Sequence, residues 1–118
     1  MKKNNREKGA VYEDKAALFL EKKGYQILEK NFYTRQGEID IVAKDENCLV
    51  FVEVKYRKKD GLSSALFAVT KQKQKRLLAA AKIYLYVKKY RMDIPCRFDV
   101  IAFDGEEITH IVNAIEAG

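Results

Sequence analysis

Two short segments near the middle of the chain combine β-strand patterning with charged side chains where a core strand would be apolar. Segment 37–42 contains Asp40, and segment 51–55 contains Glu53 and Lys55. Residues two apart on a strand point to the same side, about 6.6 to 7 Å apart, so Glu53 and Lys55 share one face. The polar loop between the segments predicts a hairpin. The sequence therefore predicts two carboxylates and one ammonium at one edge of a sheet.

A divalent cation would explain why these charges stand among Val and Ile residues. Buried charges are unfavourable unless they pair or bind an ion. Mg²⁺ takes carboxylate, water and phosphate oxygens as ligands, and Asp40 with Glu53 would supply the protein's share. Lys55 would orient a water molecule and neutralise charge on a phosphate as a phosphodiester bond breaks. The pattern favours Mg²⁺, with Mn²⁺ as the second candidate metal.

The same pattern has a plainer interpretation as a solvated strand face. Alternating polar and apolar residues are typical of any half-exposed antiparallel hairpin, in which Asp40 or Glu53 would form an ordinary ion pair with Lys55. However, Leu49 and Phe51 keep the Glu53 face apolar up to the carboxyl end of the strand. Ligand sites commonly occupy that end of a strand in α/β sheets, so we favour the functional interpretation.

Glu13 is a candidate third acid. It lies in a predicted helix, on the same apolar stripe as Ala16, Ala17 and Leu20, and is expected to face the sheet. There it would bind the metal directly or through water. The alternative stays open that Glu13 lies at the border of the stripe and reaches solvent, as helical glutamates usually do.

Basic side chains follow the predicted site along the chain. The net charge of +6 and the pI near 9.3 favour a polyanionic partner. A charge run is usually a solvated surface, but the position of this one favours phosphate binding. Lys73 stands out because a helix start can hold a backbone phosphate. The predicted nucleic-acid-binding residues are Arg57, Lys58, Lys59, Lys71, Lys73, Lys75 and Arg76.

The order of predicted elements indicates a single α/β domain with a mixed sheet over residues 1–118, in which residues 1–8 form a flexible basic arm. The elements are a helix at 7–23, strands at 25–32, 37–42 and 51–55, a helix capped by Thr70, and strands at 97–103 and 108–112 around the hairpin signal Asp104–Gly105. The residues expected on the inner faces of the helices are Ala10, Val11, Ala16, Ala17, Leu18 and Leu20 in the first, and Leu77, Leu78, Ala81, Tyr84 and Leu85 in the second.

Other kinds of site are disfavoured. His110 has no Cys, Asp or Glu at ligand spacing, so a zinc site is a minority interpretation. Asp99 is expected to point inward and bond to backbone or to Arg97. Cys48 and Cys96 lack CxxC spacing, and no signal peptide precedes the domain, so we expect reduced thiols and a cytoplasmic location. No segment is long enough to cross a membrane, and no Gly-rich nucleotide-binding loop is present.

Over nearly the whole chain, these residues resemble a known pattern. The matching positions are Glu13, Gly37–Asp40, Phe51–Lys55, Lys73 and Arg97–Val100. They are similar to the bacterial YraN-like family, which is placed by its motif in the restriction-endonuclease-like superfamily, and to archaeal Holliday-junction resolvases. The PD-(D/E)xK signature of that superfamily is carried here by Asp40, Glu53 and Lys55.

The resemblance implies a restriction-endonuclease-like αβββαβ core, a central mixed sheet flanked by helices and a magnesium-dependent phosphodiesterase site. Asp40 and Glu53 would bind the metal, Lys55 would assist the water, and Glu13 would correspond to the helix-borne acid of the resolvases. A junction resolvase places two sites on two strands, so a homodimer is implied as well. One departure is visible: this chain has Tyr12 where members usually carry a glycine.

The leading hypothesis is a metal-dependent endonuclease acting on DNA, including branched or junction DNA. A first alternative is a nucleic-acid-binding accessory protein that keeps the nuclease fold without turnover. A second is a protein-interaction module in which the acidic cluster is a structural ion-pair network.

Overall fold

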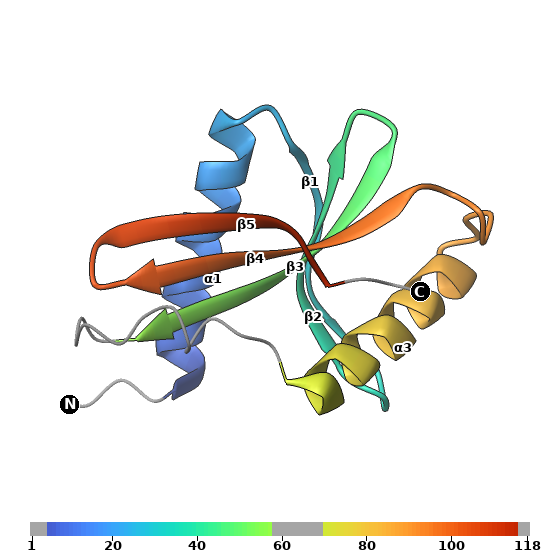
Figure 1. Cartoon of the computed structure of the whole chain (residues 1–118), viewed down its shortest axis with the longest axis horizontal. Helices are drawn as coiled ribbons and strands as arrows, with labels where there is room; N and C mark the ends of the chain where they lie inside the picture. Colours follow the sequence, from blue (N-terminus) through green and yellow to red (C-terminus); the bar gives the residue numbers. More distant parts are fainter. Residues whose placement is uncertain (1–4, 58–69, 116–118) are drawn as a thin grey trace.

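In the part of the chain that the structure describes, the fold is a five-stranded sheet with one helix on each face (Figure 1). The computed structural model describes residues 5–57 and 70–115. The elements are α1 (Asn5–Lys22), β1 (Gln26–Tyr33), β2 (Glu38–Asp45), β3 (Cys48–Arg57), α3 (Lys71–Val87), β4 (Cys96–Asp104) and β5 (Glu107–Ile115). This order contains the expected αβββαβ core and confirms the α/β class. Helix α1 begins at Asn5, inside the segment expected to be an arm.

The five strands lie side by side in chain order. All neighbouring pairs are antiparallel except β3 and β4, which are parallel, so the expected mixed sheet is confirmed. A parallel pair needs a crossover connection, and the chain between β3 and β4 contains α3. This connection places α3 over one face, while α1 passes behind strands β3 to β5 in Figure 1.

Helix α1 presents small side chains to the sheet. Ala16, Ala17 and Leu20 are buried in a cluster with residues of β2, β3 and β4. The expectation that Ala10, Val11 and Leu18 also face inward is wrong, because Ala10 is exposed, Val11 is 38% exposed and Leu18 is 58% exposed. At about 3.6 residues per turn, Val11 and Leu18 point away from the stripe that contains Ala16 and Leu20.

Helix α3 matches its sequence pattern closely. The Oγ1 atom of Thr70 accepts a hydrogen bond from the backbone N–H of Lys73 at 3.1 Å, which confirms the predicted cap. The expected inner face is also confirmed: Leu77, Ala81, Tyr84 and Leu85 are buried, and Leu78 is half-buried. Neither of the described helices is long and apolar enough to cross a membrane.

The hairpin between β4 and β5 turns where Asp104–Gly105 predicted it. Gly105 has φ +63°, a backbone conformation that glycine adopts without strain. The two cysteines on the neighbouring strands β3 and β4, Cys48 and Cys96, are free thiols.

A polar network fills the α1 side of the sheet near β5. The buried carboxylate of Asp99 accepts hydrogen bonds from Arg97 Nε at 3.1 Å and from the backbone N–H of Asn113 at 2.9 Å. His110 Nε2 lies 2.8 Å from the same carboxylate. Lys23 Nζ lies 2.9 Å from His110 Nδ1. Because an ammonium only donates, Nδ1 accepts and the ring proton on Nε2 is donated to Asp99. The prediction that Asp99 points inward and binds Arg97 is confirmed.

Removing the Asp99 carboxylate should destabilise the protein strongly. In Asp99→Ala, the half-buried Arg97 guanidinium and the buried His110 ring lose their acceptor, so we expect the free energy of unfolding to fall by about 3–5 kcal/mol. Urea unfolding measures this loss. The control is Asp93→Ala, because Asp93 forms an exposed ion pair with Arg91 and its loss should cost about 1 kcal/mol or less. Equal losses in the two variants would contradict the structural role of Asp99.

Candidate active site

The candidate site forms where β2 and β3 separate. At that end the last paired residues of the two strands are Ile41 and Val52. Beyond them, the backbone N–H of Val54 donates to Oδ2 of Asp40 at 2.8 Å. The Asp40 side chain therefore replaces a backbone carbonyl as the acceptor for this N–H group. The end of the β2–β3 hydrogen-bond ladder thus fixes the position of the Asp40 carboxyl group.

The turn before β2 is shaped to approach α3. Thr34 Oγ1 accepts hydrogen bonds from the backbone N–H groups of Gln36 and Gly37, both at 3.0 Å. A Cβ atom on Gly37 would lie 3.0 Å from the carbonyl oxygen of Arg76 and 3.1 Å from its Cβ. Glycine is thus required for the start of β2 to lie against the first turns of α3.

Asp40 and Glu53 form a buried pair of carboxylates. Asp40 is 8% exposed, and the Glu53 side chain is 12% exposed. Burial, followed by the nearby Glu53 carboxylate, raises the pKa of Asp40 to about 9. Oε2 of Glu53 lies 3.5 Å from Nζ of Lys73, whereas Oε1 is buried and has no hydrogen-bond partner among the residues described. The two strands thus place two carboxyl groups together, and the start of α3 supplies Lys73 as a counter-charge to Glu53.

Glu13 is a neighbour of this pair. It is half-buried on the inner side of α1, as its position on the apolar stripe predicts. Burial raises the pKa of Glu13, a hydrogen bond from the Asn31 side chain opposes that shift, and Glu13 in turn contributes to the raised pKa of Asp40. Asn31 itself has φ +58°, a conformation in which Asn is enriched among non-glycine residues.

The carboxylates do not form a three-ligand metal centre. Within residues 5–57 and 70–115, no three Asp, Glu, His or Cys side chains are grouped closely enough to hold one ion. The structure brings Asp40 and Glu53 together and leaves Glu13 beside them. Magnesium commonly takes only one or two carboxylates from a protein, together with waters and substrate phosphate oxygens.

The predicted basic residues that the structure describes are divided between β3 and the first turns of α3. Lys55 is half-buried and follows Glu53 by two positions on β3. On α3, Lys71, Lys75 and Arg76 are exposed, while Lys73 pairs with Glu53. Arg57 is the last residue of β3, and Lys58 and Lys59 lie outside the described residues.

Tyr12, the departure from the family pattern, has a packing partner. Its ring stacks on Tyr56 with centroids 4.4 Å apart and planes 12° apart, and Phe103 tilts against it at 5.0 Å. The ring thus joins the middle of α1 to the ends of β3 and β4, next to Glu13 in the chain.

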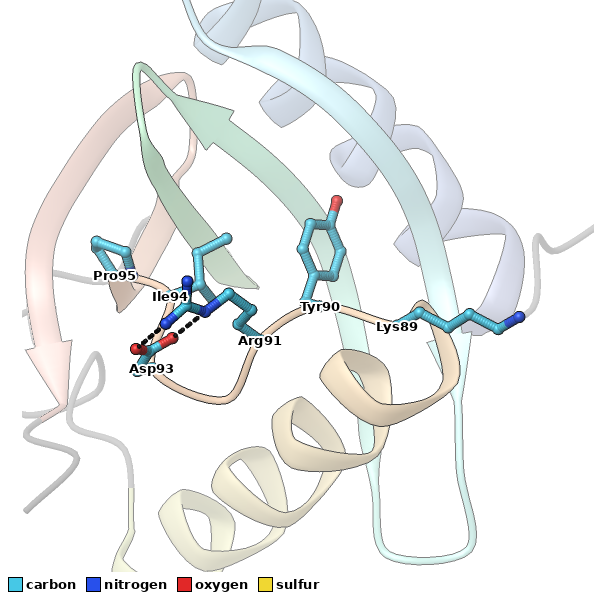
Figure 2. A pocket seen from close by; sticks show the side chains of 6 residues that line it. All are labelled: Lys89, Tyr90, Arg91, Asp93, Ile94 and Pro95. Atoms are coloured by element: carbon cyan, nitrogen blue, oxygen red, sulfur yellow. Dashed lines mark hydrogen bonds and ion pairs between the residues drawn. The ribbon is translucent and has the colours of Figure 1, made fainter.

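Sequence reasoning missed the positioning residues Asn31 and Thr34, and the role of Gly37. The only sequence signal for the turn is Thr34 three residues before Gly37, a spacing at which a side-chain hydroxyl can bond back to the backbone. It also missed a hollow of about 550 Å³ at the opposite end of α3, shown in Figure 2. No predicted site residue contributes to it, since its lining consists of Lys89, Tyr90, Arg91, Asp93, Ile94 and Pro95.

The fold and the site together define an α/β protein with two buried carboxylates at the point where two strands of a mixed sheet separate. The chain belongs to the family described as "Uncharacterised protein family UPF0102", which matches residues 12–103. This confirms the resemblance to the YraN-like family. The matched region contains Glu13, Asp40, Glu53, Lys55 and Lys73.

Relatives in the same family cover nearly the whole chain. The UPF0102 protein of Janthinobacterium sp. (strain Marseille) is 49% identical over 92% of this chain and 87% of its own length. That of Lachnoclostridium phytofermentans is 46% identical over 97% of both chains. That of Geobacter sulfurreducens is 44% identical over 96% of this chain and 91% of its own.

Adding a methyl group at Gly37 should loosen the site. In Gly37→Ala, the new Cβ would meet the Arg76 backbone at 3.0 Å, so the turn or α3 must move. We expect the free energy of unfolding to fall by about 1–3 kcal/mol, as in overpacked cores, measured by urea denaturation. In the control Gly9→Ala, the Cβ meets nothing within 4 Å, and the helical position should be stabilised by up to about 1 kcal/mol. A neutral Gly37→Ala would refute the close-approach argument.

Proposed function

We propose that this protein is a metal-dependent nuclease that hydrolyses phosphodiester bonds in DNA. The observation that supports this most is the buried pair Asp40 and Glu53, in which Oε1 of Glu53 has no hydrogen-bond partner in the described part of the chain. Two ionised carboxylates this close would repel each other, so metal-free Asp40 keeps its proton up to a high pH, and an unsatisfied buried oxygen is unfavourable. A divalent cation between them would offset both effects.

The donor set fits Mg²⁺ or Mn²⁺. Asp40 and Glu53 offer hard oxygen ligands, which these ions prefer over the thiolate and imidazole groups favoured by zinc. The hydrogen bond from Val54 holds Oδ2 of Asp40 in place, so this ligand is positioned before an ion arrives. A bound ion would supply Lewis-acid activation of a phosphate oxygen and of a coordinated water molecule.

The cationic residues would handle the phosphate. Lys55, on the same strand face as Glu53, would orient the attacking water and neutralise charge developing on the phosphate. Lys73 supplies a counter-charge to Glu53 and stands in the first turn of α3. It would hold a backbone phosphate together with Lys71, Lys75 and Arg76.

The proposal extends to branched DNA and to a homodimer through the resemblance to junction resolvases. The net charge of +6 supports a nucleic-acid substrate. An accessory protein that binds DNA without cutting it would share this charge, so a cleavage assay must separate the two functions.

Cleavage should depend on both carboxylates and on added metal. We expect wild-type protein with Mg²⁺ or Mn²⁺ to cut at least one of labelled linear, flapped and four-way-junction DNA. Asp40→Asn and Glu53→Gln should each lose roughly 10²-fold or more of the cleavage rate, as happens when a group that stabilises transition-state charge is removed. The control Glu21→Gln, which changes an exposed acid of α1 outside the candidate site, should cut normally. Cleavage by Asp40→Asn at the wild-type rate would remove the assignment, and binding without cutting in all variants would support the accessory protein.

The raised pKa of Asp40 makes the stability of the metal-free protein depend on pH. The pKa of the Asp40 carboxyl group is about 9 in the folded state, and its ordinary value is 3.8. The folded state therefore binds this proton more tightly, and the resulting contribution to the free energy of unfolding is lost as the pH rises from 3.8 to about 9. We therefore expect metal-free Asp40→Asn to be more stable than wild type at about pH 8, with a smaller difference at about pH 5.

Magnesium should reverse that order. The ion favours ionised Asp40, so it should raise the Tm of wild type at about pH 8 and leave Asp40→Asn nearly unchanged. Thermal unfolding with EDTA and with added Mg²⁺ measures both effects. An Asp40→Asn variant that is less stable than metal-free wild type at the higher pH would contradict the buried, proton-binding role of Asp40.

A further inference from the structure

The outward side of α3 carries basic residues and no acidic residue. The 17-residue helix KQKQKRLLAAAKIYLYV contains five basic residues and no acidic residue. Lys71, Lys75 and Lys82 recur at helical spacing on the side opposite the buried Leu77 and Tyr84, and all three lysines are exposed. They form a stripe that begins beside the candidate active site.

No carboxylate within the described residues forms an ion pair with Lys71, Lys75 or Lys82. By contrast, the neighbouring lysines that approach the sheet are paired, Lys73 with Glu53 and Lys88 with Glu29. Like charges four residues apart destabilise a helix, and cations in its first turn oppose the helix dipole. The stripe thus lacks internal compensation, which a polyanionic ligand would provide.

Exposed apolar side chains gather where the stripe ends. Tyr86 is 81% exposed, Val87 54% and Met92 61%. Large exposed apolar groups that occur together commonly mark an interaction surface. Tyr86 follows Lys82 by four positions, so its ring lies on the basic side of the helix.

The hollow shown in Figure 2 follows the end of α3 along the chain. Lys89 and Arg91 contribute cations to its lining, and Arg91 is held by two hydrogen bonds to Asp93, at 3.1 and 2.9 Å. Tyr90 is fixed in the wall by stacking on Tyr84, with ring centroids 6.1 Å apart. Lys89, which is exposed, thus adds one cation just beyond the end of the basic stripe.

We infer that the outward side of α3, with Lys89 just beyond it, binds an unpaired nucleic-acid strand. Lys71, Lys75, Lys82 and Lys89 would contact phosphates, and a base would stack on Tyr86. Sequence-tolerant binding of single strands combines a basic path with exposed aromatic rings. A duplex presents its phosphates but keeps its base faces stacked inside, so it would leave Tyr86 without a partner.

The surface has a direction relative to the candidate active site. Lys71 and Tyr86 are separated by 15 helical residues, which corresponds to roughly 22 Å at about 1.5 Å per residue. Lys73, which contacts Glu53, lies at the near end. The inference rests on the proposed nuclease function in one respect: the strand bound along α3 would be one that enters or leaves the site of cleavage.

Binding of a fluorescent oligonucleotide of about 20 deoxythymidines tests the inference without cleavage. Anisotropy is measured in EDTA, which removes divalent metal. We expect Tyr86→Ala to weaken binding about tenfold, Tyr86→Phe to bind like wild type, and the control Leu18→Ala, which removes an exposed side chain from α1, to have no effect.

Salt dependence tests the lysines separately. The double variant Lys82→Ala, Lys89→Ala removes two phosphate contacts, so the slope of log K against log salt should become shallower by about 1.4. The control Lys22→Glu, on α1, changes the net charge by the same two units and should leave the slope closer to that of wild type.

Three results would overturn the inference: no binding of the oligonucleotide, equal losses in Tyr86→Ala and Leu18→Ala, or the same Tyr86-dependent loss for a blunt duplex. The test of this binding surface does not depend on the result of the cleavage assay. Tyr86-dependent binding without any cleavage would remove the proposed nuclease and keep the binding surface, whereas cleavage with unaltered binding by Tyr86→Ala would remove the surface alone.

Discussion

The candidate site depends on one hydrogen bond, from the backbone N–H of Val54 to the carboxylate of Asp40. Where two antiparallel strands separate, backbone N–H groups lose their partners, and unpaired N–H groups are unfavourable in a protein interior. A carboxylate at this position satisfies one of them and is itself drawn into the sheet. The strand geometry thereby forces an acid into a buried position 2.8 Å from the backbone of β3, next to Glu53.

The described part of the chain contains two buried groups of ionisable side chains, which differ in how fully their polar atoms are hydrogen-bonded. Around Asp99, the carboxylate meets Arg97, His110 and a backbone N–H, so its oxygens are paired within the protein. Around Asp40, burial and a second carboxylate raise the pKa, and an oxygen of Glu53 is left without a partner in the described residues. The arrangement around Asp99 is that of a structural network. The arrangement around Asp40 and Glu53 would be stabilised by a bound cation.

Helix α3 connects the parts of the proposed function. Its first turns pack on the turn before β2 through Gly37 and reach Glu53 through Lys73. Leu77 and Tyr84 on its buried side pack in the core. Its outward side has no acidic residue from Lys71 to Tyr86. One helix therefore helps to build the acidic site and provides a basic surface that leads away from it.

The sequence by itself determined the element order, the inner side of α3, its Thr70 cap and the pairing of Asp40 with Glu53, because strand alternation, helical spacing and hairpin loops are local signals. It did not determine that Val11 and Leu18 face outward, since an apolar residue on a helix is not obliged to face the core. Only the tertiary structure decided the contact of His110 with Asp99, the packing of Gly37 on α3 and the raised pKa of Asp40. Each of these arises from groups far apart in the chain, and burial and proximity exist only once the sheet has brought them together.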